Sequence, residues 1–176
     1  MKKIIAIVAA LVVVLGVFAA CASQKAPEVT SYEGTIEELV STLYEKEPVE
    51  FMLGSPRVVD FADDYSVSSC LGLESAEGLK EAICSEPMTG SQAYSLVIAR
   101  VSDTAKIEEL KKAMFEGINP AKWLCVEADK LRVVSSGDLI MLVMVSSDLN
   151  ADLADGMVEA FKTTVGELSG ETLSKG

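Results

Sequence analysis

Histidine is missing from all 176 residues of this chain, and its absence narrows the chemistry that the chain can perform. A nucleophilic Cys or Ser usually passes its proton to a histidine, and zinc sites usually combine His with Cys. A glycine-rich phosphate loop is also missing. We therefore assign no catalytic residue, no metal centre and no cofactor from these features.

Basic residues are few. Lys and Arg together number 15 against 27 Asp and Glu, which gives a formal net charge of −12. A surface of this sign repels phosphate backbones and anionic lipid headgroups. The sequence therefore predicts no nucleic-acid partner, and it excludes electrostatic docking as the means of membrane attachment.

Charge is almost absent from the first 20 residues, where Lys2 and Lys3 precede an unbroken apolar run that ends in Ala19 and Ala20. A positive end, an apolar core and small residues at the cleavage point define a secretory signal peptide. Cys21 follows at once and resembles the acylated residue of the bacterial lipobox. Residues 1–20 are thus predicted to be a lipoprotein signal peptide, and Cys21 its lipidation site.

This prediction places the protein outside the cytoplasm, attached to the cell membrane by its N-terminal lipid. The alternative is that residues 4–20 remain as an uncleaved transmembrane anchor, which would leave the rest of the chain in the same compartment. Residues 21–34 are small and polar and are typical of a tether. Loss of Lys2 and Lys3 on cleavage lowers the formal charge from −12 to −14.

The remaining residues, 35–176, have a length that suits one domain, and their patterns predict an α+β fold. Apolar residues recur at helical spacing near 36–46, 103–118 and 149–168, so we expect these helices to pack on one face of a small antiparallel sheet. The strands are expected near 94–101, 131–135 and 139–146. Residues 49–92 are hard to interpret, apart from a short helix expected near 75–84.

A further helix is expected to begin at Asn119 and Pro120, because Asn is a common N-cap and Pro a common first helical residue. This helix would carry Trp123 and Leu124 inward. Its next residue, Cys125, is then predicted to be buried between apolar neighbours.

Three cysteines remain once Cys21 is set aside, so at least one is unpaired in a monomer. Cys70 and Cys84 are close enough in sequence to form a disulfide. The alternative is that all three, Cys125 included, are buried thiols that act as small apolar side chains.

Acidic residues provide two further candidates. Paired carboxylates such as Asp63 with Asp64, or Glu127 with Asp129, could supply the acid and base of a cell-envelope hydrolase, although such pairs usually lie on a solvated surface. A calcium loop would use oxygen ligands at positions that match four residues here, but it needs glycine where this chain has Leu153. Those four residues are Asp148, Asn150, Asp152 and Glu159.

The segment NPAKWLCVEADKLRVVSSGDLIMLVM, from Asn119 to Met144, resembles a family of lipoproteins of unknown function from Gram-positive, often anaerobic, bacteria. The resemblance extends over about 91–166. It implies a lipid-anchored α+β domain outside the cytoplasm and assigns no activity. An anaerobic habitat would also disfavour oxidation of Cys70 and Cys84.

These observations predict a non-enzymatic binding or scaffolding module at the outer face of the membrane, with an envelope protein as its partner. The alternative function is a cell-envelope hydrolase that uses a carboxylate pair.

Overall fold

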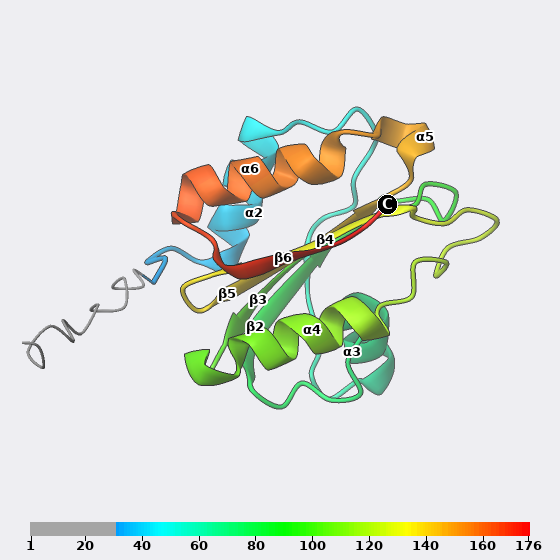
Figure 1. Ribbon diagram of the computed structural model, residues 1–176. Coiled ribbons are helices and arrows are strands. Elements are labelled where there is room, and N and C mark those ends of the chain that lie inside the picture. The colour runs from blue at the N-terminus through cyan, green and yellow to red at the C-terminus, as the bar shows by residue number, and fades with distance from the viewer. Residues whose placement is uncertain (1–30) are drawn as a thin grey trace, which may run out of the picture.

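The computed structural model describes residues 31–176, so the predicted signal peptide, Cys21 and most of the predicted tether lie outside the described residues. Six strands form one antiparallel sheet in the order β1-β2-β3-β5-β4-β6 (Figure 1). The strands are β1 Arg57–Val58, β2 Leu79–Ser85, β3 Tyr94–Val101, β4 Lys130–Ser136, β5 Leu139–Val145 and β6 Ser169–Lys175. The helices are α2 Ile36–Lys46, α3 Asp64–Leu71, α4 Ile107–Gly117 after a 3₁₀ turn Thr104–Lys106, α5 Ser147–Asn150 and α6 Leu153–Val165. The predicted α+β class is confirmed.

Helices cover both faces of the sheet, which corrects the expectation that they share one face. Helices α2 and α6 pack on one side and α3 and α4 on the other, each pair over its own apolar core (Figure 1). The reason lies in β3 and β5, whose every residue is buried. A strand that is apolar on both alternating sets of side chains needs cover on both faces.

The helix ends follow from local sequence. Thr35 and Glu38 form a reciprocal capping box at the start of α2, which then buries Ile36, Leu39 and Leu43. Asp103 caps the 3₁₀ turn before α4. Within residues 31–176, no helix is both long enough and apolar enough to cross a membrane.

The short helix predicted near 75–84 is wrong, because most of this segment forms β2. Leu79 and Ile83 have the spacing of one helix face, but a bulge between Leu79 and Glu81 directs Leu79 to the sheet face covered by α3 and α4 and Ile83 to the face covered by α2 and α6. β2 pairs along β3 and buries its last four residues, Ala82 to Ser85. Gly78, with φ of +88°, lies in the turn that leads into the strand.

The helix predicted at Asn119 and Pro120 is also absent from the structure. The Ala121 amide donates to Asn119 Oδ1, and the Ala128 amide donates to the Pro120 carbonyl, which closes a loop. Cys125 has φ of 61°, a conformation that an α-helix cannot contain. Residues 119–129 therefore cross the end of the sheet as a loop.

Strand β6 was not predicted, because its residues are mostly exposed and have no apolar alternation. It pairs with β4 at the edge of the sheet. The buried Lys111 ammonium holds it there, donating hydrogen bonds to the Ser169 and Glu171 carbonyls at 3.3 and 2.9 Å.

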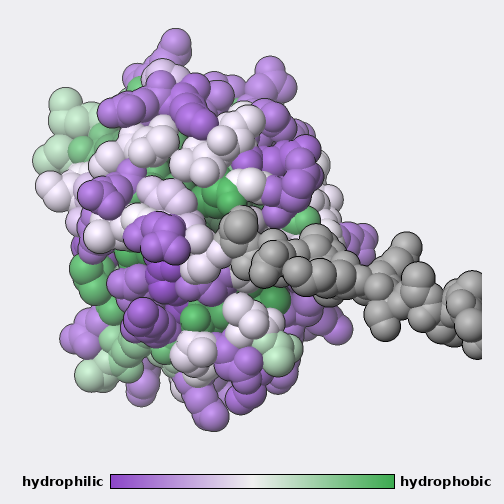
Figure 2. All heavy atoms as spheres, turned by 90° about the vertical axis from the view of Figure 1, so that its left-hand side faces the viewer, coloured by the Kyte–Doolittle hydropathy of each residue, from purple (hydrophilic) through white to green (hydrophobic). Residues whose placement is uncertain are grey.

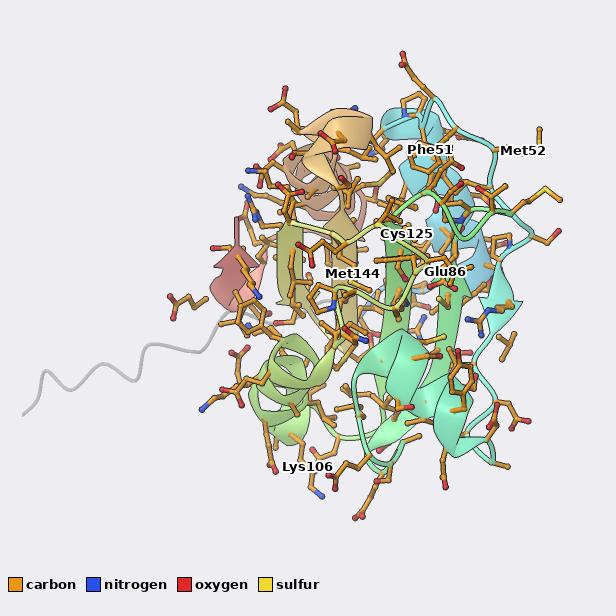
Figure 3. All side chains as sticks on the ribbon, turned by 90° about the vertical axis from the view of Figure 1, so that its right-hand side faces the viewer. Phe51, Met52, Glu86, Lys106, Cys125 and Met144 are labelled. Carbon is orange, nitrogen blue, oxygen red and sulfur yellow. The ribbon has the colours of Figure 1, made fainter. Side chains whose placement is uncertain are left out.

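The sheet has two unlike ends. The described chain begins at one of them, where Ser31 donates to Asp138 in the β4–β5 turn and Arg100 donates to the Tyr32 and Gly34 carbonyls. We call this the near end; Figure 2 shows that its surface is largely hydrophilic. At the opposite end, the distal end, four connecting segments meet, which we call the distal loops: residues 47–56, 86–93, 119–129 and 146–152, the last of which includes α5 (Figure 3).

Candidate functional site

Exposed apolar side chains gather at the distal end. Among residues 31–176, five large apolar side chains are classed as exposed, and three of them belong to the distal loops: Met52, Met88 and Leu124, at 70%, 67% and 77% exposure. Large exposed apolar patches on a soluble domain often mark interaction sites. We call these three residues the distal patch.

Backbone hydrogen bonds join the three loops that carry the distal patch. The Met88 amide donates to the Met52 carbonyl at 3.3 Å, and Leu53 forms a β-bridge with Pro87. The Leu124 amide donates to the Gly90 carbonyl at 3.0 Å. The patch is therefore part of the folded framework, and Met52 projects outward at its edge in Figure 3.

A buried ion pair lies beneath the patch. Lys122 Nζ lies 2.6 Å from Glu86 Oε1, and the two side chains are only 12% and 22% exposed. Burial alone would raise the pKa of Glu86, but the charges and hydrogen bonds of Lys122 and Arg57 together outweigh it, so that the pKa of Glu86 is lowered. Arg57 Nη2 contacts the other carboxylate oxygen at 3.0 Å. Glu86 thus joins β1 to the 119–129 loop.

Lys122 also lies beside a potential nucleophile. Its Nζ donates to the Ser69 carbonyl at 2.8 Å and to Ser95 Oγ at 3.3 Å. A Ser–Lys pair can form a catalytic dyad when the lysine is neutral and the serine can reach substrate. Here the Lys122 ammonium is paired with the Glu86 carboxylate at 2.6 Å, and Ser95 is fully buried. The arrangement stabilises the loop and offers no nucleophile to a substrate.

Cys70 and Cys84, the candidate disulfide pair, are both free thiols in the structure. They are fully buried, with Cys70 Sγ 3.9 Å from Ser69 Oγ and Cys84 Sγ 3.7 Å from Ser95 Oγ. The neighbouring Cys84 thiol lowers the pKa of Cys70 to about 6, helped by the nearby Arg57 and Lys122 charges, and the Cys70 thiol in turn raises the pKa of Cys84, as burial does too. Disulfide formation between them stays a prediction.

Cys125 is exposed, contrary to the predicted burial, because its loop turns outward and carries Leu124 with it. It borders two shallow hollows at the distal end. One, of about 460 Å³, is lined by Trp123, Val126 and Glu127 among others. The other, of about 320 Å³, is lined by Glu127, Asp129 and Asp148 among others. Trp123 itself packs partly against the core.

The calcium-loop candidates lie where α5 leads into α6. Asn150 Oδ1 accepts a hydrogen bond from the Asp152 amide, and Leu153 is fully buried at the start of α6. Asp148, Asn150, Asp152 and Glu159 are all exposed. Among residues 31–176, no three Cys, Asp or Glu side chains are grouped closely enough to hold a metal ion. The geometry fits a helix start.

The predicted carboxylate pairs lie on exposed surface, and only Glu127 and Asp129 border a common shallow hollow. Asp63 caps α3 by accepting from the Tyr65 amide, and Asp64 is exposed in the first helical turn. Asp129 accepts a hydrogen bond from the Ser147 amide at 2.6 Å, and this bond lowers the pKa of Asp129. Glu127 lies exposed beside it.

A third acidic hollow lies between α4 and the loop that precedes β2, with a volume of about 580 Å³. Its lining includes Glu74, Glu77, Glu109 and Glu116. All four are exposed, whereas a glycosidase general acid normally lies in an apolar, desolvated position. The hollow therefore gives the hydrolase alternative little support.

The distal patch was missed by the sequence reasoning, since Met52 and Met88 stand in the stretch that could not be interpreted and Leu124 was expected to face inward. Comparisons of the chain with protein-family models, with curated proteins and with solved structures found no match.

Proposed function

We propose that this chain is a lipid-anchored, extracytoplasmic domain that binds or scaffolds another envelope protein. The observation that carries the proposal is the separation of two features. The described chain begins at the near end, and the distal patch lies at the far end of the strands. A domain attached through its N-terminal segment would present Met52, Met88 and Leu124 away from the anchor.

The anchoring itself is supported by the sequence alone. Lys2, Lys3, the apolar run and Cys21 match a lipoprotein signal. Replacement of Cys21 by Ser is expected to abolish acyl modification. Mass spectrometry of membrane-extracted protein should find the wild-type chain without residues 1–20 and with added acyl mass. An intact Met1 on the wild-type protein would contradict lipidation and support the uncleaved anchor.

The binding function is tested by crosslinking in native membranes with the full chain. We expect wild type to crosslink to a partner protein that the M52S/M88S/L124S variant loses. The matched control is V58S/Y65S, which alters the two other large apolar side chains exposed among the described residues. The control should crosslink as wild type does. Equal crosslinking by all three proteins, or none by wild type, would overturn the proposal.

A further inference from the structure

The exposed charged side chains within the distal loops are acidic, and basic side chains flank these loops: Arg57 follows residues 47–56, Lys130 follows residues 119–129, and Lys175 pairs beside Leu131 at the same end of the sheet. The four distal loops carry five exposed carboxylates and no exposed Lys or Arg. These carboxylates are Glu50, Glu127, Asp129, Asp148 and Asp152. The one lysine in the loops, Lys122, is largely buried and paired with Glu86, so it does not offset them at the surface.

The carboxylates and the apolar side chains lie on loops at the same end of the sheet. Glu50 is two residues from Met52, and Leu124 is followed by Cys125, which borders the hollow lined by Glu127, Asp129 and Asp148. In Figure 3 Cys125 and Glu86 lie near the middle of this end, with Met52 at one side. Methionine side chains are flexible and polarisable, which suits them to contacts with apolar side chains of varied shape.

We propose that the distal surface binds a cationic, amphipathic polypeptide segment of its partner. The proposal rests on the proposed binding function and adds the chemistry of the partner. Apolar side chains of the segment would contact Met52, Met88 and Leu124, and its Lys or Arg side chains would pair with Glu127, Asp148 and Glu50. Surfaces that combine Met side chains with carboxylates commonly bind peptides that have one apolar face bordered by Lys or Arg.

Other occupants fit less well. An anionic lipid surface would meet like charge at the acidic border and, for a domain anchored through its N-terminal segment, lies on the side of the near end. A second copy of this chain would bring the same five carboxylates against themselves. A cationic segment satisfies the apolar patch and the acidic border together.

The probe is a synthetic helical peptide of Leu and Lys with the leucines on one face, titrated into the full chain in detergent micelles and followed by fluorescence anisotropy. We expect the M52S/M88S/L124S variant to bind it at least tenfold more weakly than wild type. The V58S/Y65S control should bind as wild type does. A peptide of the same design with Glu in place of Lys should not bind.

The acidic border is tested by a separate variant, E50Q/E127Q/D148N. None of these three side chains forms a hydrogen bond in the structure. The variant should bind the Leu/Lys peptide several-fold more weakly, and added salt should reduce the difference from wild type. Equal binding by wild type and both distal variants would overturn this inference. If native crosslinking still required the distal patch, the binding function would stand and only the cationic character of the partner would be wrong.

Discussion

The near and distal ends of the sheet differ in the side chains that they expose to solvent. At the near end, the Arg100 side chain is 8% exposed and forms ion pairs with Glu81 and Asp138, both at 2.8 Å, and it also binds the backbone at Tyr32 and Gly34. At the distal end, Met52, Met88 and Leu124 lie open to solvent. The near end is therefore closed by polar contacts that fasten the entering chain, and the distal end keeps apolar surface uncovered. If the proposed binding function holds, the surface that recognises the partner lies at the opposite end from the contacts that fasten the entering chain.

The largest change in stability is expected from the replacement of Arg100 by Leu. The change leaves Glu81 and Asp138 without their partner and frees two carbonyls at the near end, so we expect a loss of about 3 kcal/mol in the free energy of unfolding. Urea denaturation measures it. Lys112→Leu is the control, because Lys112 forms only an exposed pair with Glu116 at 3.7 Å. Equal losses for both variants would show that the near end is not a special source of stability.

Glu86→Gln tests the buried pair beneath the distal patch, and we expect a loss of about 2 kcal/mol because Lys122 and Arg57 lose a common partner. The pKa of Glu86 is lowered in the folded protein. Its stabilisation is therefore fully present above the ordinary pKa of a glutamate and disappears as the pH falls through the lowered value. The gap between wild type and variant should shrink on acidification. A gap that stays constant from neutral to acidic pH would contradict the ion pair.

Thiol reactivity tests whether exposure or ionisation controls the cysteines. The pKa of Cys70 is lowered to about 6, yet Cys70 and Cys84 are fully buried, whereas Cys125 is exposed. We expect Cys125 to react with a thiol reagent at least about 100-fold faster than the other two, because they react only after local opening. Peptide mapping of the labelled full chain identifies each site. Rapid labelling of Cys70 would mean that α3 opens easily.

The smallest effect is expected from the distal patch itself. Because Met52, Met88 and Leu124 are already exposed, the M52S/M88S/L124S variant should change the free energy of unfolding by less than about 1 kcal/mol. Thermal and urea denaturation of this variant beside Arg100→Leu complete the comparison of the two ends. A large loss of stability would show that the patch belongs to the core and would weaken its assignment as a binding surface.

Much of the fold could be predicted because its central elements carry strong periodic patterns. The range 36–46 matches α2 and the range 94–101 matches β3, and the range 139–146 matches β5 to within one residue. It was harder to predict which helices cover which face of the sheet. β3 is apolar on both sides, but nothing local says which helix covers which face, and that choice depends on contacts between distant segments.

The distal patch could not be predicted, because its three apolar residues stand far apart in the sequence, each in a different loop. Leu124 between Trp123 and Cys125 has the pattern of a buried segment, and only the hydrogen bond from its amide to Gly90 and the positive φ of Cys125 turn it outward. Met52 and Met88 meet through a β-bridge between neighbouring residues. Such long-range backbone pairing leaves no periodic signal in either segment.

The strand order has a consequence for how the chain folds. β4 and β5 form a hairpin across Gly137, which adopts φ of 62°, so this pair can form early, on the microsecond scale of isolated hairpins. The central pairing is different, since β3 joins β5 and brings Tyr94 beside Val145 only after α4 and the 119–129 loop have been accommodated. Contacts so distant in sequence slow folding. We expect refolding in milliseconds to seconds, with β3 docking on a preformed β4–β5 hairpin.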